Sequence, residues 1–134
     1  MNNIKLPKVR LLAFILAVTF NPESVVLAAG PAPGALPTGG QITAGSGAIN
    51  QAGNVMNIQQ NTARMITNWQ TFNVGQNAKV NFLQPSASAV SLNRVLSADP
   101  SQILGQLNAN GVVVLLNPNG VLFGASARVD VGGL

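Results

Sequence analysis

Hydrophobic and polar residues alternate in short runs along most of the chain after residue 40. In Val80-Asn81-Phe82 and in Val90-Ser91-Leu92-Asn93 every second residue is apolar. A period of two places apolar side chains on one face of a strand and amides on the other. The pattern predicts strands at Gln41–Thr43, Ala48–Gln51, Val55–Gln60, Met65–Trp69, Thr71–Val74, Lys79–Gln84, Ala89–Val95, Val112–Leu116, Val121–Phe123 and Arg128–Val131.

One stretch between these strands has a different pattern. Asp99 directly precedes Pro100, and apolar residues follow at Ile103, Leu104 and Leu107. Asp is a favoured N-cap, and Pro is favoured at the first helical position. We therefore expect one or two helical turns here.

The predicted strands are too short and too closely spaced for the crossover helices of a parallel α/β sheet. Two all-β architectures remain, an antiparallel sandwich and a solenoid of stacked short strands. The many Asn residues favour the solenoid, because amides at equivalent positions of successive coils can form hydrogen-bonded ladders. No strict repeat period is visible in the chain.

A tight turn is predicted at Asn117-Pro118-Asn119-Gly120, between two apolar strands. Proline fixes φ at the second turn position, Asn is tolerated at the third, and Gly suits the fourth. The segment is therefore expected to form a strand, a type I turn and a second strand.

The first 28 residues have the organisation of a cleavable signal peptide. Three basic residues and no acid precede the apolar run Leu11–Phe20, and small residues at Val26 and Ala28 suit a cleavage site. A membrane-spanning helix needs about 20 apolar residues, whereas this run has ten. We expect cleavage after Ala28, or else after Ala29. The absence of an Arg-Arg pair favours the general secretory translocase.

Removal of the signal peptide changes the charge of the chain. Four basic and two acidic side chains remain, which gives a formal charge of +2. No basic cluster survives, so the composition does not indicate nucleic-acid binding. The Pro/Gly-rich segment Ala29–Gly40 is expected to be an extended, poorly ordered lead-in. The domain itself is expected to occupy residues 41–134.

The residue types that usually carry catalysis are scarce. The chain has no Cys, His or Tyr, and only Asp99 and Asp130 supply carboxylates after residue 28. No Ser–His or Cys–His pair and no metal-ligand cluster can be assembled. A glycosidase generally needs two carboxylates at a defined separation, and Asp99 is expected to cap a helix. We therefore expect neither an enzyme nor a cofactor-binding protein.

Several short sequence motifs, taken in order, resemble the N-terminal secretion domain of two-partner secretion exoproteins, the group of the filamentous haemagglutinin and the high-molecular-weight adhesins. The similarity runs from about Thr43 to the last residue. The motifs are Trp69-Gln-Thr-Phe-Asn-Val-Gly75, Val80-Asn-Phe-Leu-Gln-Pro85, Ser91-Leu-Asn-Arg-Val95, Ile103-Leu-Gly-Gln-Leu107, Ala109-Asn-Gly111, Leu116-Asn-Pro-Asn-Gly-Val-Leu-Phe-Gly124 and Val129-Asp-Val-Gly-Gly-Leu134.

The resemblance implies a right-handed parallel β-helix with an N-terminal cap. It implies an export address that is recognised by the periplasmic POTRA domains of an outer-membrane transporter of the Omp85 superfamily. The exoprotein would reach the surface of a Gram-negative bacterium through the periplasm and fold there progressively. The hallmark turn of the family corresponds to residues 117–120. The other family motif and core positions are Trp69, Phe72, Asn73, Asn93, Arg94, Asn110 and Gly111.

The chain departs from the family pattern in two respects. It lacks the Asn-Pro-Asn-Leu motif that many members carry upstream, and it stops at Gly132-Gly133-Leu134, within the motif region. We therefore expect a solenoid that is truncated at its C-terminal end. The alternatives are a short self-sufficient haemagglutinin or adhesin binding module and a non-functional gene remnant. Host-cell contact would belong to regions downstream.

Three aromatic residues, Trp69, Phe82 and Phe123, are expected to be buried in the core. Trp69 is expected to be a buried anchor that packs near Phe72, because large aromatic side chains bury the most area. If Arg94 points inward it needs a partner, and Asp99 is the nearest carboxylate in sequence.

Overall fold

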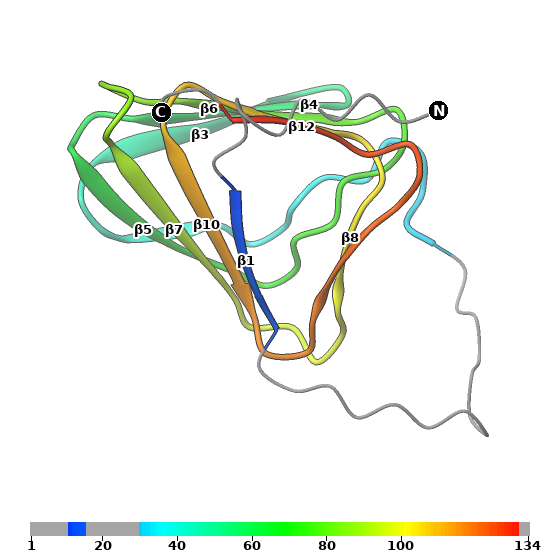
Figure 1. The fold of residues 1–134 in the computed structure, drawn as a ribbon. Helices are drawn as coiled ribbons and strands as arrows, with labels where there is room; N and C mark the ends of the chain where they lie inside the picture. Colours follow the sequence, from blue (N-terminus) through cyan, green and yellow to red (C-terminus); the bar gives the residue numbers. More distant parts are fainter. Residues whose placement is uncertain (1–10, 16–29, 132–134) are drawn as a thin grey trace.

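The computed structural model describes residues 11–15 and 30–131, which form twelve strands and no helix. Figure 1 shows a three-sided outline, with one sheet on each side. The strands are β1 (Leu11–Ile15), β2 (Gln41–Ala44), β3 (Gly47–Ala52), β4 (Val55–Gln60), β5 (Arg64–Trp69), β6 (Lys79–Leu83), β7 (Val90–Val95), β8 (Ser101–Ile103), β9 (Gln106–Ala109), β10 (Val112–Asn117), β11 (Val121–Phe123) and β12 (Arg128–Val131).

Successive coils of the chain stack in parallel register. The first sheet has the order β3-β4-β6-β9-β12, the second has β2-β5-β7-β10-β1, and the third pairs β8 with β11. A bridge between Val74 and Ile103 extends the third sheet into the first coil. Each coil thus supplies strands to the three sides in turn, so the fold is a parallel β-helix. The prediction of a solenoid is confirmed, and a sandwich is excluded.

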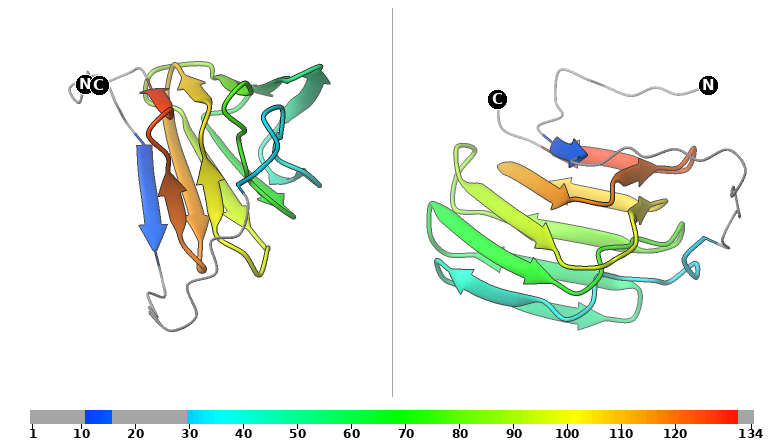
Figure 2. Two further views of the ribbon diagram at one scale, coloured as in Figure 1. Left: turned by 90° about the vertical axis from the view of Figure 1, so that its right-hand side faces the viewer. Right: turned by 90° about the horizontal axis from the view of Figure 1, so that it is seen from below.

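The N-terminal end of the β-helix is closed by antiparallel strands. β2 pairs with β5 and β3 pairs with β4, both antiparallel, so the first coil has no free edge on these two sides. The predicted N-terminal cap is therefore present. Figure 2 shows this cap in cyan at one end of the stack and β12 at the other.

The lead-in differs from the expected poorly ordered segment. Leu36 and Pro37 are buried, and the backbone N–H of Gly75 donates to the carbonyl of Ala35 at 2.9 Å. The N–H of Asn77 donates to the carbonyl of Pro33 at 2.8 Å. Residues 30–40 are therefore packed on the first coil, because their backbone satisfies groups that the coil leaves unpaired.

Inward-facing residues of the three sheets form one continuous core. Ile58 lies beside Phe82 in register, and Val80 lies beside Leu107, with each side chain at most 1% exposed. Their alternation with half-exposed residues reproduces the period of two in the sequence. Burial of side chains of this size stabilises the fold by about 1.5–3 kcal/mol each. The sequence pattern therefore identified the core face correctly for these strands. The expected burial of Phe123 is wrong, because this side chain on β11 (Val121–Phe123) is 44% exposed.

The predicted helix between Asp99 and Leu107 is wrong, because strands β8 and β9 occupy this segment. The N–H of Leu104 donates to the carbonyl of Val74 in the coil below, and the N–H of Gly124 donates to the carbonyl of Ile103 from the coil above. Pairing between coils therefore replaces the local hydrogen bonds of a helix, and tertiary contacts override the capping signal.

The described part of the predicted leader is β1, which lies parallel to β10 with Leu11 opposite Val113 and Ile15 opposite Asn117. The rest of the leader, including the expected cleavage positions Ala28 and Ala29, lies outside the described residues, as do residues 132–134. Among the residues that the structure describes, no helix is long and apolar enough to cross a membrane.

Candidate functional site

The turn at residues 117–120 connects β10 to β11 at the corner between the second and third sheets. The N–H of Gly120 donates to the carbonyl of Asn117 at 3.0 Å, which closes a four-residue turn. Asn119 has a negative φ, since the positive φ angles among the described residues belong to glycines, and Gly120 has φ of 108°. A type II turn would require a positive φ at Asn119. The geometry is therefore that of the predicted type I turn.

The side chain of Asn117 ties this turn to the coil below. It is fully buried, and its Nδ2 donates to the carbonyl of Asp99 and to Ser101 Oγ, both at 3.0 Å. Its Oδ1 accepts a hydrogen bond from the N–H of Asn119 at 2.9 Å. The amide therefore uses both of its ends, which a carboxylate or an apolar side chain of the same size could not do.

The outer part of the turn faces solvent. Pro118 and Asn119 are exposed, and Asn119 Nδ2 donates to the carbonyl of Ser97 at 2.7 Å. Asp99 contributes its carbonyl to Asn117, and it does not cap a helix as the sequence suggested. The turn is therefore hydrogen-bonded to the segment from Ser97 to Ser101, and these bonds hold two successive coils together.

Trp69 and its neighbours anchor the first coil. Trp69 and Phe72 are each 1% exposed, and their rings meet edge to face with centroids 5.5 Å apart. Trp69 Nε1 donates to the Oδ1 of Asn93, which is fully buried one coil above, at 2.9 Å. Trp69 therefore packs as the sequence predicted, and Asn93 satisfies its only polar group.

Two further motif residues also link coils. Asn73 Oδ1 accepts a hydrogen bond from the N–H of Gln102 at 2.9 Å. Arg94 is exposed, and its Nε donates to Asn68 Oδ1 at 2.9 Å. Arg94 lies on the outer face of the second sheet and has this amide as partner, so the inward orientation that would have needed Asp99 does not occur.

Asn110 and Gly111 lie at a different corner, between the first and second sheets. Asn110 Nδ2 donates to the carbonyl of Gln84, and its Oδ1 accepts from the N–H of Gln84, both at 2.7 Å. Gln84 Oε1 accepts from the N–H of Gly111, and its Nε2 donates to Gln60 Oε1 one coil below. A Cβ at residue 111 would come within 2.9 Å of the carbonyl oxygen of Ala89, which explains the glycine.

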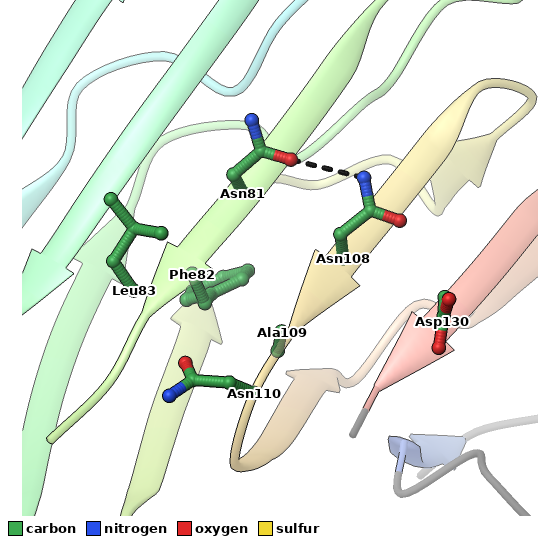
Figure 3. A pocket seen from close by; sticks show the side chains of 7 residues that line it. All are labelled: Asn81, Phe82, Leu83, Asn108, Ala109, Asn110 and Asp130. Carbon is green, nitrogen blue, oxygen red and sulfur yellow. Dashed lines mark hydrogen bonds between the residues drawn. The ribbon is translucent and has the colours of Figure 1, made fainter. Parts of the chain in front are cut away.

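An amide ladder runs along the outer face of the first sheet. Asn81 Nδ2 donates to Asn57 Oδ1, and Asn108 Nδ2 donates to Asn81 Oδ1, both at 3.0 Å. Asp130 occupies the next position in register, on β12. Figure 3 shows Asn81, Asn108 and Asp130 following one another across neighbouring strands. They line a shallow hollow of about 260 Å³. The ladder confirms the role that the scattered Asn residues suggested.

The predicted residues therefore form ties between coils at separate corners and do not converge on one cleft. Asp130 lies in the first sheet and Asp99 precedes a strand of the third, so they belong to different faces. Within residues 11–15 and 30–131, no group of three metal-ligating side chains is present. The arrangement is suited to holding coils in register.

Sequence reasoning missed several of the acceptors and partners in these ties. The turn bonds to the carbonyls of Ser97 and Asp99 and to Ser101 Oγ, none of which the sequence had assigned to it. Gln84 lies within the motif Val80–Pro85, but its role as a buried link between coils was not predicted. A recoverable signal existed for the ladder alone. Asn57, Asn81 and Asn108 follow one another at intervals of 24 and 27 residues, and each lies between two inward-facing positions.

Comparison with known proteins gives a consistent assignment. The family model of the TPS secretion domain matches residues 33–134. A heme/hemopexin-binding protein of Haemophilus influenzae is 43% identical over 99 residues, which is 74% of this chain and 11% of the relative. A second protein of that name and species is 44% identical over 79 residues, covering 59% of this chain and 8% of the relative. The chain thus spans about a tenth of the length of these relatives.

A solved structure shows the same architecture. The secretion domain of HMW1 from Haemophilus influenzae matches with a TM-score of 0.66 and 36% sequence identity. The match covers 69% of this chain and 25% of that chain. Together with the family match over residues 33–134, it establishes that the chain belongs to the family of TPS secretion domains, which carry the export address of two-partner secretion exoproteins.

Proposed function

We propose that this domain directs its exoprotein to an Omp85-type outer-membrane transporter, whose periplasmic POTRA domains bind the chain before it has folded completely. The family assignment supports a dedicated partner transporter. The turn at residues 117–120 is the observation that carries the proposal. The buried Asn117 holds this turn against the preceding coil through two hydrogen bonds. The turn can therefore close only when the chain has folded onto that coil.

The proposed route begins with the general secretory translocase, which would recognise residues 1–28 as a leader, and continues through the periplasm. The mature domain would then occupy the chain from residue 29 or 30. Progressive folding at the cell surface suits this architecture, because each coil hydrogen-bonds only to its neighbours and can add to the one before it.

Binding of haem or hemopexin is not proposed for these residues. Haem iron is held by His, Cys, Met or Tyr. The chain has no His, Cys or Tyr, and Met56 and Met65 are buried in the core. Within residues 11–15 and 30–131, no exposed side chain of these types is therefore present, and no haem site is proposed there. Catalysis is likewise not proposed, because Asp130 lies in β12 of the first sheet and Asp99 lies in the loop before β8 of the third.

An export assay tests the address. Asn119→Pro removes the N–H that donates to Asn117 Oδ1, and proline is disfavoured at the third turn position. We expect this variant to disappear from the culture supernatant, as it should in a strain that lacks the partner transporter. The measurement is an immunoblot of supernatant and periplasm with an antibody to residues 48–134.

Ala125→Pro is the matched control for this assay. Ala125 is exposed at the second position of a neighbouring turn that the N–H of Ala127 closes onto the carbonyl of Gly124. Proline is favoured at that position, so export should continue. Normal export of Asn119→Pro would contradict the proposal. Export that persists without the transporter would instead favour a stand-alone adhesin module, to be checked by glycan binding of the purified domain, or a gene remnant.

A further inference from the structure

The second sheet ends in a strand that comes from the beginning of the chain. Each strand of this sheet is covered by the strand one coil later, so that β7 covers β5 and β10 covers β7. On β10 the same place is taken by β1, which runs parallel to it over five residues. An uncovered β10 would present a row of unpaired N–H and C=O groups. β1 therefore occupies the position of a following coil, as Figure 2 shows in blue.

The five residues of β1 are also the first half of the apolar run Leu11–Phe20. In the proposed leader this run is the segment that the export machinery recognises. A backbone that is hydrogen-bonded into a sheet is not available for that recognition. The two uses of residues 11–15 therefore exclude each other.

We propose that in the folded precursor β10 sequesters the apolar segment of the leader, so that folding and leader-dependent export compete for residues 11–15. The inference rests on the proposed leader function. A precursor that folds before export withholds its own signal. Once the leader has been removed, the edge of β10 is free to receive another strand.

Hydrogen exchange on the purified full chain tests the pairing. The N–H groups of consecutive strand residues point to opposite sides, and proline removes a ladder hydrogen bond where the N–H faces the neighbour. One of Leu12→Pro and Ala13→Pro must therefore break the pairing with β10. In that variant we expect the amides of residues 112–117 that face β1 to exchange about tenfold faster or more. Ala17→Pro, in the same apolar run but outside β1, should leave them unchanged.

Flotation with phosphatidylethanolamine/phosphatidylglycerol vesicles measures whether the leader is withheld. Folded wild-type precursor and Ala17→Pro should stay largely in the soluble fraction. The variant that breaks the pairing should float, although proline makes the run less apolar. Unchanged exchange in the strands β5 and β7 shows that the fold persists in each variant.

Equal exchange of residues 112–117 in the wild type and all three variants would overturn the proposal. Flotation of the folded wild type as complete as that of the variant that breaks the pairing would do the same. The leader function itself is tested separately by N-terminal sequencing of the exported product. A product that retains residues 1–28 would defeat the leader while leaving the exchange result as it stands.

Discussion

At the residue scale, buried amides hold the coils together. Asn117, Asn93 and Gln84 are at most 7% exposed, and each forms hydrogen bonds both to a neighbouring coil and to residues nearby in its own coil. A buried polar group costs free energy unless it is hydrogen-bonded. These amides therefore favour one register of the coils, since a shift would leave them unpaired.

Replacing Asn117 by aspartate tests this role of a buried amide with almost no change of shape. Asn117→Asp turns the Nδ2 donor into an acceptor that faces the carbonyl of Asp99 and Ser101 Oγ. We expect the free energy of unfolding to fall by about 3 kcal/mol, because a buried unpaired and charged group results. Urea titration followed by Trp69 fluorescence provides the measurement.

The matched control is Asn119→Asp, in the same turn. Asn119 is exposed, and the change removes one hydrogen bond, to the carbonyl of Ser97. Its cost should be about 1 kcal/mol or less, because water can replace the lost partner. Equal losses in the two variants would show that burial of Asn117 does not decide its contribution.

At the element scale, the strands are defined by pairing between coils more than by local preference. The segment of β8 and β9 carries a capping signal for a helix, yet Ile103 and Leu107 are both fully buried in strands. Gly105 between them fits closely against the carbonyl oxygens of Gly75 and Ala78, where a side chain would clash. The two strands therefore meet at a corner that only glycine permits.

The amide ladder allows a test at this scale. Asn81→Ala removes both ladder hydrogen bonds, whereas Asn57→Ala removes only the terminal one. We expect losses in the free energy of unfolding of about 1–2 kcal/mol for Asn81→Ala and about half of that for Asn57→Ala, since each exposed bond contributes modestly. The measurement is urea unfolding of both variants under the same conditions. A loss for Asn57→Ala that equals or exceeds that for Asn81→Ala would refute additive ladder bonds.

At the scale of the whole molecule, the two ends of the stack differ. At one end, β2 and β3 cover the first coil with antiparallel pairing. At the other end, Leu122 and Phe123 on β11 of the third coil are 56% and 44% exposed. A solenoid gains its stability from contacts between adjacent coils. Protection should therefore decrease from the capped end towards β11 and β12.

Native-state hydrogen exchange measures this gradient. We expect the amides of β4, β5, β6 and β7 to exchange slowest, and those of β11 and β12 to exchange about tenfold faster or more, because local opening near an edge is less costly. Full-length precursor is the sample. The peptide of β3, the antiparallel edge strand at the other end of the first sheet, serves as the comparison. Uniform protection along the stack would indicate that all coils open together.

The sequence by itself determined most of the strand-forming runs, the turn at residues 117–120 and the inward face of most strands. These features depend on local properties, namely the alternation of apolar residues and the fixed φ of Pro118. The short motifs also determined the family resemblance, which the comparisons then confirmed. The strand expected at Thr71–Val74 is wrong, because Thr71 and Val74 form isolated bridges there. The sequence did not predict β8 and β9, because the local signal there favours a helix. It also did not predict that residues 30–40 pack on the first coil, because their Pro/Gly-rich composition is typical of a poorly ordered segment.

Only the tertiary structure decided which residues meet across coils. The side chains of Asn117, Trp69 and Gln84 form hydrogen bonds with those of Ser101, Asn93 and Gln60, respectively. The two residues of each pair are 16 to 24 residues apart in the sequence. No fixed repeat length relates these positions, because the corner loops differ in length from coil to coil. The partners of each amide therefore follow from the register of the stacked strands, which long-range backbone pairing and burial set together.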